Sequence, residues 1–296
     1  MKHLLDIKEL NRHQIELLFD LADRLNHQPR EQKPLAGRSA IALFFENSTR
    51  TLTSFQLACQ RLGVDLTALN IAHSSTQKGE TLRDTILTLD AMQTDAFIVR
   101  HQDNHMQRDM AEWINHRASV INAGDGTNQH PTQGLLDLYT IRQHQGQFEP
   151  LSVAIIGDTK HSRVANSLLD GLQIMGTKDI RLFAPDTFVA DHQKTFLADS
   201  LQSAISEADV VVMLRIQRER LSDQTNLDVE AWAAHYGLNS ERLKWAKKEA
   251  IVMHPGPMNR GVEITDAVAD GPQSVILNQV TNGVLIRQAL IRQLLS

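Results

Sequence analysis

The sequence predicts an α/β protein made of two open, doubly wound domains, each with a central parallel sheet. Short apolar strand patterns alternate with helical patterns along the whole chain. The length of 296 residues exceeds the usual size of one domain. A polar stretch that ends in Pro150 interrupts the alternation near the middle. Repeated strand and helix units favour a parallel sheet covered on both faces.

The first half of the chain contains four expected strands separated by helical patterns. Apolar residues recur at helical spacing from Ile15 to Leu25, and Pro29 and Pro34 then break the pattern. The expected strands cover residues 39–45, 66–71, 96–100 and 119–122. The expected helices cover residues 51–62 and 81–92, a segment through Trp113 and a segment after Pro131.

The second half repeats this scheme, with expected strands at residues 153–157, 180–184, 210–214 and 250–253. Residues 278–295 carry apolar side chains on one broad helical face, which must be buried against another part of the protein. We therefore expect a first domain at residues 1–146, a second domain at residues 147–277 and a C-terminal helix at residues 278–296.

Composition and charge point to a protein that acts on small molecules. The balance of 42% hydrophobic and 22% charged residues is ordinary for a globular protein, and the net charge of −5 disfavours nucleic-acid or membrane partners. The single cysteine, Cys59, rules out an intrachain disulfide. A charge precedes any apolar run at the N-terminus, and no stretch approaches the roughly 18 apolar residues of a membrane span. These features predict a cytoplasmic location.

Four strand ends in the first half carry polar groups suited to anions. Ser48, Thr49, Arg50 and Thr51 lie where a strand stops and a helix starts, and a helix N-terminus binds anions through its free N–H groups. An ordinary N-cap beside a solvated arginine is the commoner meaning of an isolated Ser-Thr-Arg. The other groups are Ser74, Ser75 and Lys78 in a polar loop, Arg100 at a strand end, and His130 at a helix start.

Each of these three groups also has an ordinary explanation. The loop can be a plain surface loop, and Arg100 can pair with a nearby carboxylate. Pro131 suits the first position of a helix, so the helix dipole would keep His130 neutral and able to donate a hydrogen bond. One fold would bring all four strand ends to a single crevice, which favours an anion site over chance.

The second half places two arginines after strands in the same way. Arg163 follows the strand at residues 153–157, and Arg215 and Gln217 follow the strand at residues 210–214. Guanidinium groups bind carboxylates bidentately, so this pattern suits a dicarboxylate, although surface basic residues would look the same. No dinucleotide fingerprint and no phosphate loop occur, and no His-x-x-x-His pair lies on an expected helix beside an acid, so no cofactor and no metal are expected.

Several motifs, in order along the whole chain, resemble the transcarbamoylases. They are Phe44-Phe45-Glu46-Asn47, Ser48-Thr49-Arg50-Thr51, Lys78-Gly79-Glu80-Thr81, Arg100-His101, His130-Pro131-Thr132-Gln133 and His254-Pro255-Gly256-Pro257. The segment from Arg215 to Arg220 looks like the aspartate-binding signature of that family. Ornithine enzymes instead carry His-Cys-Leu-Pro where this chain has residues 254–257. The resemblance implies carbamoyl transfer to aspartate, the committed step of pyrimidine biosynthesis.

The resemblance also implies the roles of individual residues. The phosphate of carbamoyl phosphate would bind Ser48, Thr49, Arg50, Thr51 and Arg100. Its carbonyl would be polarised by Thr51, Arg100 and His130, and its amino group held by Gln133, Pro255 and Gly256. The carboxylates of aspartate would bind Arg163, Arg215 and Gln217, with Lys78. The residues expected to act in catalysis are Arg50, Thr51, Lys78, Arg100 and His130.

Assembly and closure are implied in the same way. Lys78, with Ser74 or Ser75, would reach into the active site of a neighbouring chain, which makes a homotrimer the minimum assembly. Larger assemblies with regulatory or dihydroorotase-like chains are compatible with it. Glu46 would pair with Arg163 and Arg220 on domain closure, and the C-terminal helix would return to the first domain.

Two positions depart from the family pattern. Leu52 stands where an arginine usually follows Ser-Thr-Arg-Thr, and Gln56 stands where a glutamate is usual. An ornithine-type transcarbamoylase and a catalytically silent homologue are the alternatives to aspartate transfer.

Overall fold

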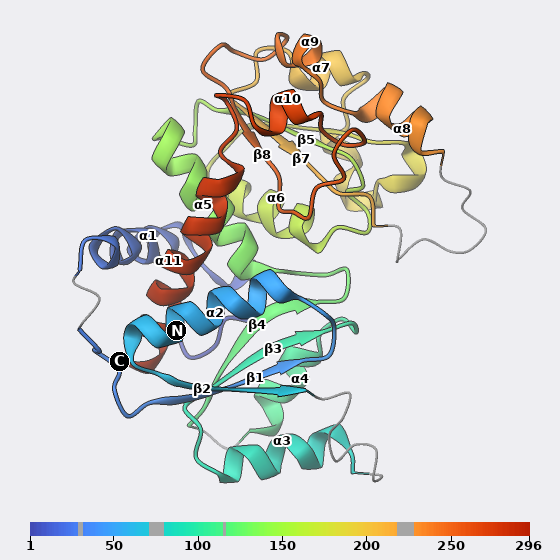
Figure 1. Ribbon diagram of the computed structural model, residues 1–296. Helices are drawn as coiled ribbons and strands as arrows, with labels where there is room; N and C mark the ends of the chain where they lie inside the picture. Colours follow the sequence, from blue (N-terminus) through green and yellow to red (C-terminus); the bar gives the residue numbers. More distant parts are fainter. Residues whose placement is uncertain (29–31, 71–79, 115–116, 218–227) are drawn as a thin grey trace. The chain divides into compact units, whose positions relative to one another are not determined.

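The computed structural model describes residues 1–28, 32–70, 80–114, 117–217 and 228–296. The chain divides into two compact units (Figure 1). Unit 1 comprises Met1–Leu136 and Thr281–Ser296, and unit 2 comprises Asp137–Val280. Each unit contains a four-stranded parallel sheet flanked by helices, which confirms the predicted fold class.

The sheet of unit 1 is built from four short parallel strands. They are β1 (Ser39–Phe44), β2 (Asp65–Asn70), β3 (Ala96–His101) and β4 (Ser119–Asp125). Their spatial order is β2-β1-β3-β4, so the chain leaves β1 on one side for β2 and returns on the other side for β3. All pairings are parallel, as the nearly continuous apolar runs of these strands predict.

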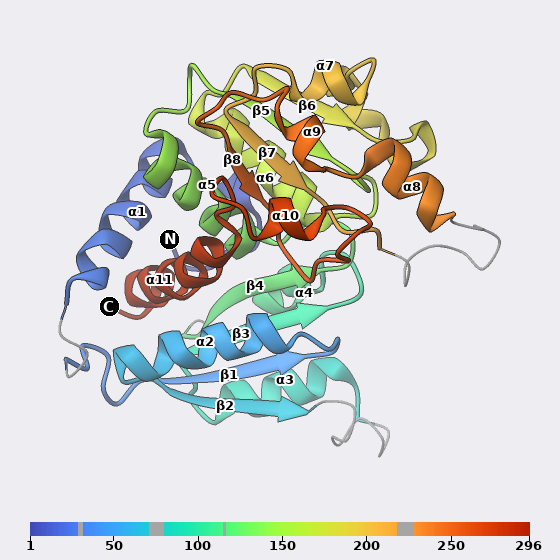
Figure 2. The same ribbon diagram turned by 45° about the horizontal axis from the view of Figure 1, so that its top comes forward.

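Helices cover both faces of this sheet. Helix α2 (Thr49–Leu62) lies on one face, and α3 (Leu82–Ala91) and α4 (Met106–Trp113) lie on the other (Figure 2). Apolar side chains of β3 and β4 meet Ile86 of α3 and Met110 of α4 in a buried core. Unit 1 also contains the short η1 (Ile7–Glu9) and α1 (Arg12–Asn26), whose Asn11 and Gln14 form a capping box.

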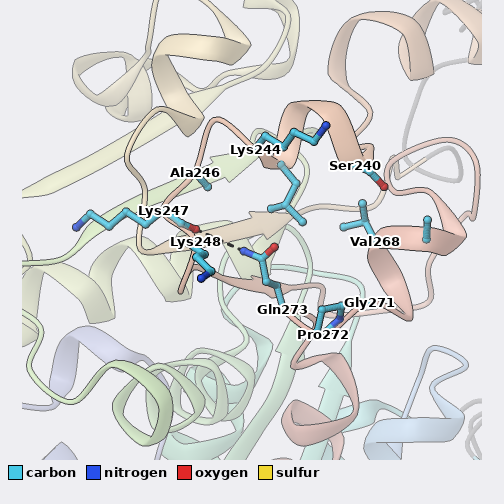
Figure 3. A pocket seen from close by; sticks show the side chains of 11 residues that line it. Ser240, Lys244, Ala246, Lys247, Lys248, Val268, Gly271, Pro272 and Gln273 are labelled. Carbon is cyan, nitrogen blue, oxygen red and sulfur yellow. Dashed lines mark hydrogen bonds between the residues drawn. The ribbon is translucent and has the colours of Figure 1, made fainter.

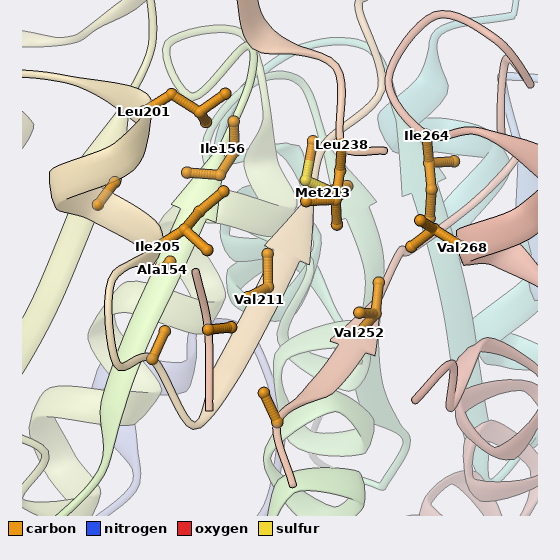
Figure 4. Close-up of a cluster of buried hydrophobic side chains, with 14 of the residues drawn as sticks. Ala154, Ile156, Leu201, Ile205, Val211, Met213, Leu238, Val252, Ile264 and Val268 are labelled. Atoms are coloured by element: carbon orange, nitrogen blue, oxygen red, sulfur yellow. The ribbon is translucent and has the colours of Figure 1, made fainter. Parts of the chain in front are cut away.

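Unit 2 repeats the same strand order. Its strands are β5 (Ser152–Ile156), β6 (Asp179–Phe183), β7 (Val210–Met213) and β8 (Ile251–Met253), arranged as β6-β5-β7-β8. Figure 4 shows one side of its core, where apolar side chains of the three strands β5, β7 and β8 meet Ile205. Burying each large aliphatic side chain contributes roughly 1.5–3 kcal/mol.

The helices of unit 2 are mostly short. They are α6 (Arg163–Met175), η4 (Asp186–Phe188), η5 (Asp191–Phe196), α7 (Leu201–Ile205), α8 (Val229–Tyr236), α9 (Ser240–Leu243) and α10 (Asp266–Ala269). Two longer helices, α5 (Pro131–Gln145) and α11 (Ile276–Leu295), have residues in both units. No helix within the described ranges is long and apolar enough to cross a membrane.

The second half of α11 packs within unit 1, which confirms that the C-terminal helix returns to the first domain. Its residues Ile286, Ala289 and Leu290 are fully buried. Arg61 of α2 donates a hydrogen bond to the Gln288 side chain at 3.2 Å, and Arg292 donates to the Pro34 carbonyl at 2.9 Å. These contacts fix the end of α11 against α2 and the segment before β1.

Gly157 lies directly after β5 and can be used to test how closely β5 and β7, the two central strands of unit 2, approach each other. Its φ is +119°, and a Cβ there would lie 2.8 Å from the Leu214 carbonyl oxygen. We expect Gly157→Ala to lower the free energy of unfolding by about 2–4 kcal/mol, from backbone strain plus overpacking. Urea unfolding followed by circular dichroism measures this change.

Gly146→Ala is the matched control. Gly146 also has a positive φ, +77°, but a Cβ there meets no atom within 4 Å. The control therefore carries only the backbone strain and should lose roughly 1–2 kcal/mol. Equal losses for the two variants would show that β5 and β7 do not require close approach at Gly157.

Candidate functional site

The carboxyl ends of β1 and β3 meet where the strand order of unit 1 reverses. Phe44 pairs with Arg100 in the register, and the Phe45 amide donates to the Arg100 carbonyl at 2.9 Å. Ligands of open α/β sheets bind at such a reversal, outside the carboxyl ends of the strands. The segment after β1, which contains Ser48 to Thr51, and the segment after β3 therefore share one edge.

Helix α2 begins at this edge with the predicted Ser-Thr-Arg-Thr segment. Ser48 occupies the N-cap position, but its side chain makes no capping hydrogen bond to the described backbone. Thr49 and Arg50 are exposed, and Thr51 is 9% exposed. The hydroxyl of Ser48 therefore does not act as the side-chain cap of α2 that the simple N-cap interpretation requires.

Arg100 is held by two neighbours in unit 1. Its Nε lies 3.0 Å from Oε2 of Glu46, and its Nη1 donates to the Ala123 carbonyl at 3.2 Å. Both side chains of the ion pair are mostly buried, at 14% and 21% exposure. An anion that approaches the Arg100 guanidinium must therefore compete with the Glu46 carboxylate.

The segment after β4 is organised by Asp125, which sequence reasoning did not single out. Asp125 is 2% exposed, and its carboxylate accepts hydrogen bonds from the amides of Gln129 at 2.7 Å and His105 at 3.1 Å. Because Asp125 pairs with His101 in the register, this turn lies next to the end of β3. The Gly-Asp-Gly pattern at residues 124–126 was the signal that could have identified it.

His130 and Gln133 follow this turn at the start of α5. Pro131 is the first residue of the helix, as the sequence predicted, and the His130 carbonyl accepts hydrogen bonds from the amides of Gln133 and Gly134. His130 is 5% exposed and Gln133 is 9% exposed. Three strand ends of unit 1, those of β1, β3 and β4, thus carry the predicted polar residues along the same edge.

The corresponding edge of unit 2 lies at the ends of β5 and β7. The Leu214 amide donates to the Ile156 carbonyl at 2.8 Å, so Arg163 and Arg215 follow two directly paired strands. Arg163 is the first residue of α6 and is 4% exposed. The strand order reverses between β5 and β7, as it does between β1 and β3.

Arg215 and Gln217 contact each other, since Arg215 Nη2 donates to Gln217 Oε1 at 3.1 Å. Pro255 and Gly256 follow β8, which pairs with β7, and so they lie along the same edge of unit 2. The structure thereby brings together the second-half residues that the sequence predicted. Ser74, Ser75, Lys78 and Arg220 lie outside the described residues.

Two buried carboxylates near this edge were missed by sequence reasoning. Asp158 is fully buried and accepts hydrogen bonds from the His161 ring at 2.9 Å and from the Gln217 amide at 3.3 Å. Glu263 is also fully buried and accepts from the Ile216 amide at 3.2 Å. Both therefore hold the backbone of the segment that carries Arg215.

The departures at Leu52 and Gln56 are one helical turn apart on α2. An arginine and a glutamate at these two positions would form an i, i+4 ion pair. Since Gln56 is exposed and Leu52 is half-buried, loss of both charges together leaves no unpaired arginine. The two changes are therefore compatible with an intact α2.

Metal chemistry and cysteine nucleophilic chemistry have less support in the described part of the chain. No group of three or more His, Cys, Asp or Glu side chains there is arranged to hold a metal ion. Burial raises the pKa of Cys59 to about 12, so its thiol is not a nucleophile near neutral pH.

A cavity of about 420 Å³ occurs elsewhere in unit 2 (Figure 3). Lys247 and Gln273 line it, and the Lys247 amide donates to the Ala208 carbonyl just before β7. This cavity lies at the amino ends of β7 and β8, whereas Arg215 and Pro255 follow their carboxyl ends. It is therefore separate from the candidate site.

Comparison with known proteins gives matches over nearly the whole chain. Residues 2–143 match the family model "Aspartate/ornithine carbamoyltransferase, carbamoyl-P binding domain", and residues 149–294 match "Aspartate/ornithine carbamoyltransferase, Asp/Orn binding domain". Aspartate transcarbamoylase from Trypanosoma cruzi in complex with N-(phosphonacetyl)-L-aspartic acid is 31% identical, with a TM-score of 0.89 over 100% of this chain and 96% of that chain.

Two further solved structures are similar. The same Trypanosoma cruzi enzyme in complex with carbamoyl phosphate and aspartate is 30% identical, with a TM-score of 0.89 over 100% of this chain and 97% of that chain. Ornithine carbamoyltransferase from Thermus thermophilus is 26% identical, with a TM-score of 0.87 over 100% of this chain and 99% of that chain.

Competition between Glu46 and a bound anion can be tested with inorganic phosphate. Glu46→Gln removes the negative charge beside Arg100, so we expect phosphate to bind roughly threefold to tenfold more tightly. Glu9→Gln removes a carboxylate of unit 1 that pairs with Arg108, and it should leave phosphate affinity unchanged. Isothermal titration calorimetry measures both. Weaker binding by the Glu46 variant would contradict a competing role.

His101 at the end of β3 should make stability depend on pH. Burial lowers the pKa of His101, and its Nδ1 accepts a hydrogen bond from the Asp103 amide at 2.9 Å. The folded state therefore favours the neutral ring. The stability contributed by this preference is complete above the unfolded pKa of about 6.5 and is lost as the pH falls below that value.

His101→Asn keeps a side-chain acceptor for the Asp103 amide but does not titrate. We expect the variant to lose less stability than the wild type when the pH falls from about 7.5 to about 5. Urea unfolding at the two pH values measures the difference. Identical pH dependence in the two proteins would show that the ring does not stay neutral in the folded state.

Proposed function

This chain belongs to the aspartate/ornithine carbamoyltransferase family, and on that premise we propose that it transfers the carbamoyl group of carbamoyl phosphate to the amine of L-aspartate. The products are N-carbamoyl-L-aspartate and phosphate. The observation that carries the choice of aspartate is the pair of arginines, Arg163 and Arg215, which follow two paired strands of unit 2. Two guanidinium groups suit a dicarboxylate.

Charge favours aspartate over ornithine at this edge. Ornithine has one carboxylate and a second amine, which is a cation near neutral pH, and two arginines repel a cation. The buried acids of this edge, Asp158 and Glu263, accept hydrogen bonds from backbone amides and neighbouring side chains. The complexes of the Trypanosoma cruzi enzyme with aspartate and carbamoyl phosphate support the same choice.

Unit 1 is proposed to bind the phosphate of carbamoyl phosphate. The N-terminus of α2, with Ser48, Thr49, Arg50 and Thr51, offers backbone N–H groups and a partial positive charge to the phosphate. Arg100 adds a guanidinium. The groups proposed to polarise the carbonyl are Thr51, Arg100 and His130, and those proposed to hold the amino group are Gln133 and the carbonyls of Pro255 and Gly256.

The reaction then needs no covalent enzyme intermediate. The amine nitrogen of aspartate attacks the carbamoyl carbon, and negative charge grows on the carbonyl oxygen. Hydrogen-bond donors and cations that are already oriented stabilise this charge more in the transition state than in the ground state. The C–N bond forms, the C–O bond breaks with its electron pair going to the phosphate oxygen, and the departing phosphate takes up the proton that the nitrogen gives up.

We also propose a cytoplasmic homotrimer that serves pyrimidine biosynthesis, with Glu46 pairing with Arg163 and Arg220 when substrates bind. The support is the resemblance of the segment with Ser74, Ser75 and Lys78 to a loop shared between chains. Native mass spectrometry checks the assembly, and a monomer at micromolar concentration would contradict it.

The substrate assignment is tested by phosphate release from carbamoyl phosphate with L-aspartate and with L-ornithine. We expect turnover with aspartate only. Turnover with ornithine alone would overturn the assignment, and no turnover with either would favour a catalytically silent homologue.

Arg215→Gln tests the residue that carries the assignment. Removing one charge-assisted carboxylate contact should raise the KM for aspartate by roughly 30- to 1000-fold, which corresponds to about 2–4 kcal/mol. The matched control is Arg181→Gln on β6, where the arginine pairs with Asp179. The control should leave the KM within about twofold of the wild type, and an equal rise in both variants would argue against a specific role for Arg215.

A further inference from the structure

Glu263 is a fully buried carboxylate that makes several hydrogen bonds within unit 2. Its Oε1 accepts from the Ile216 amide at 3.2 Å and from the Asn259 side-chain amide at 2.7 Å. Its Oε2 accepts from the Asn259 backbone amide at 2.7 Å. Burying an ionised carboxylate is costly unless it is hydrogen-bonded, and these three donors compensate for that cost.

The donors come from two different segments at the carboxyl edge of the sheet. Ile216 follows β7 and stands between Arg215 and Gln217, whereas Asn259 lies in the segment after β8 that also contains Pro255 and Gly256. One carboxylate therefore joins the segment proposed to bind aspartate to the segment proposed to hold the carbamoyl amino group.

The Ile216 side chain fixes the same segment from its other side. It is fully buried in a cluster with Phe188 and Trp232. The next amide, that of Gln217, donates to Asp158 at 3.3 Å. Two consecutive amides of the segment are thus held by two separate buried carboxylates, so the direction in which the neighbouring side chains leave the backbone is closely defined.

His254 adds a weaker contact from the second segment. Its Nδ1 accepts a hydrogen bond from the Gly256 amide at 2.8 Å, so a neutral ring carries its proton on Nε2. Nε2 lies 3.9 Å from Oε2 of Glu263. At that distance the ring faces the carboxylate but is beyond hydrogen-bond reach of it.

We propose that Glu263 is a positioning residue for the amino-acid substrate, which sets the spacing between the segment after β7 and the segment after β8. The inference rests on the proposed function, because it concerns the segment that carries Arg215 and Gln217. All the described partners of the Glu263 carboxylate lie in these two segments. A residue that served the general stability of the sheet would have partners within the strands.

Glu263→Gln tests this role without changing side-chain size. One oxygen becomes an NH2 group, which cannot accept, so either the Asn259 backbone amide or the Ile216 amide with the Asn259 side chain loses its acceptor, and the negative charge is removed. We expect the KM for aspartate to rise roughly 10- to 100-fold while kcat changes much less, because the groups proposed to bind the aspartate carboxylate would be misplaced. The dissociation constant of inorganic phosphate, which is proposed to contact unit 1, should not change.

Three further variants keep the test decisive. Asn259→Ala removes one donor to Glu263 and should raise the KM for aspartate about threefold to tenfold. The double variant should be less than additive, because both changes disrupt the same contact. Asp209→Asn is the matched control, since Asp209 accepts from the Ser152 amide at 2.9 Å at the opposite edge of the same sheet. It should lower stability and leave the KM unchanged.

The outcomes separate this inference from the proposed function. A wild-type protein that is inactive with aspartate overturns both. An active wild type with an unchanged KM in folded Glu263→Gln overturns the positioning role alone. If Glu263→Gln does not fold, Asn259→Ala decides the question, and an unchanged KM or a rise matched by Asp209→Asn overturns the inference.

Discussion

The parallel pairing of the two central strands in each unit is the constraint on which the rest of the structure depends. In unit 1 the Phe45 amide bonds to the Arg100 carbonyl, and in unit 2 the Leu214 amide bonds to the Ile156 carbonyl. Each bond lies at the carboxyl end of a pair where the strand order reverses. The connections that leave the two strands of each pair run to opposite sides at this point. Polar segments can therefore follow both strands without being covered by a connecting helix.

This constraint explains why the places of the candidate site residues in the fold could be predicted from the sequence. Parallel strands buried on both faces give continuous apolar runs. The strand predicted at residues 39–45 corresponds to β1, which ends one residue earlier, at Phe44. Because all strands of a parallel sheet end at one edge, a polar residue after each run has a predictable location. Arg100, Arg163 and Arg215 were located in this way.

Other features left no comparable signal. The prediction ended β4 at Asn122, but the strand continues to Asp125, because tertiary pairing overrides the weak strand preference of Asn and Gly. The short helices α8, α9 and α10 are too brief to show a helical period. The role of Glu263 depends on a contact with Ile216, which is 47 positions away in the chain, so no local pattern could indicate it.

The missed residues share a physical cause. Several arginines at one edge of a sheet concentrate positive charge there. Buried cations and buried backbone amides both require hydrogen-bond acceptors. The two units meet this requirement differently. In unit 1 Glu46 pairs directly with the Arg100 guanidinium, whereas in unit 2 the described hydrogen bonds of Asp158 and Glu263 go largely to backbone amides. A carboxylate that forms an ion pair with the guanidinium competes with an incoming anion.

A carboxylate that accepts hydrogen bonds from backbone amides acts differently, because it orders the segment that carries the arginine. The two units thus differ in how anion affinity responds to loss of an acid. Removal of Glu46 should strengthen the binding of phosphate, whereas removal of Glu263 should weaken the binding of aspartate. Both changes nevertheless take away one negative charge close to an arginine. The sign of the effect follows from which atoms the carboxylate contacts, and net charge alone would predict the same sign for both.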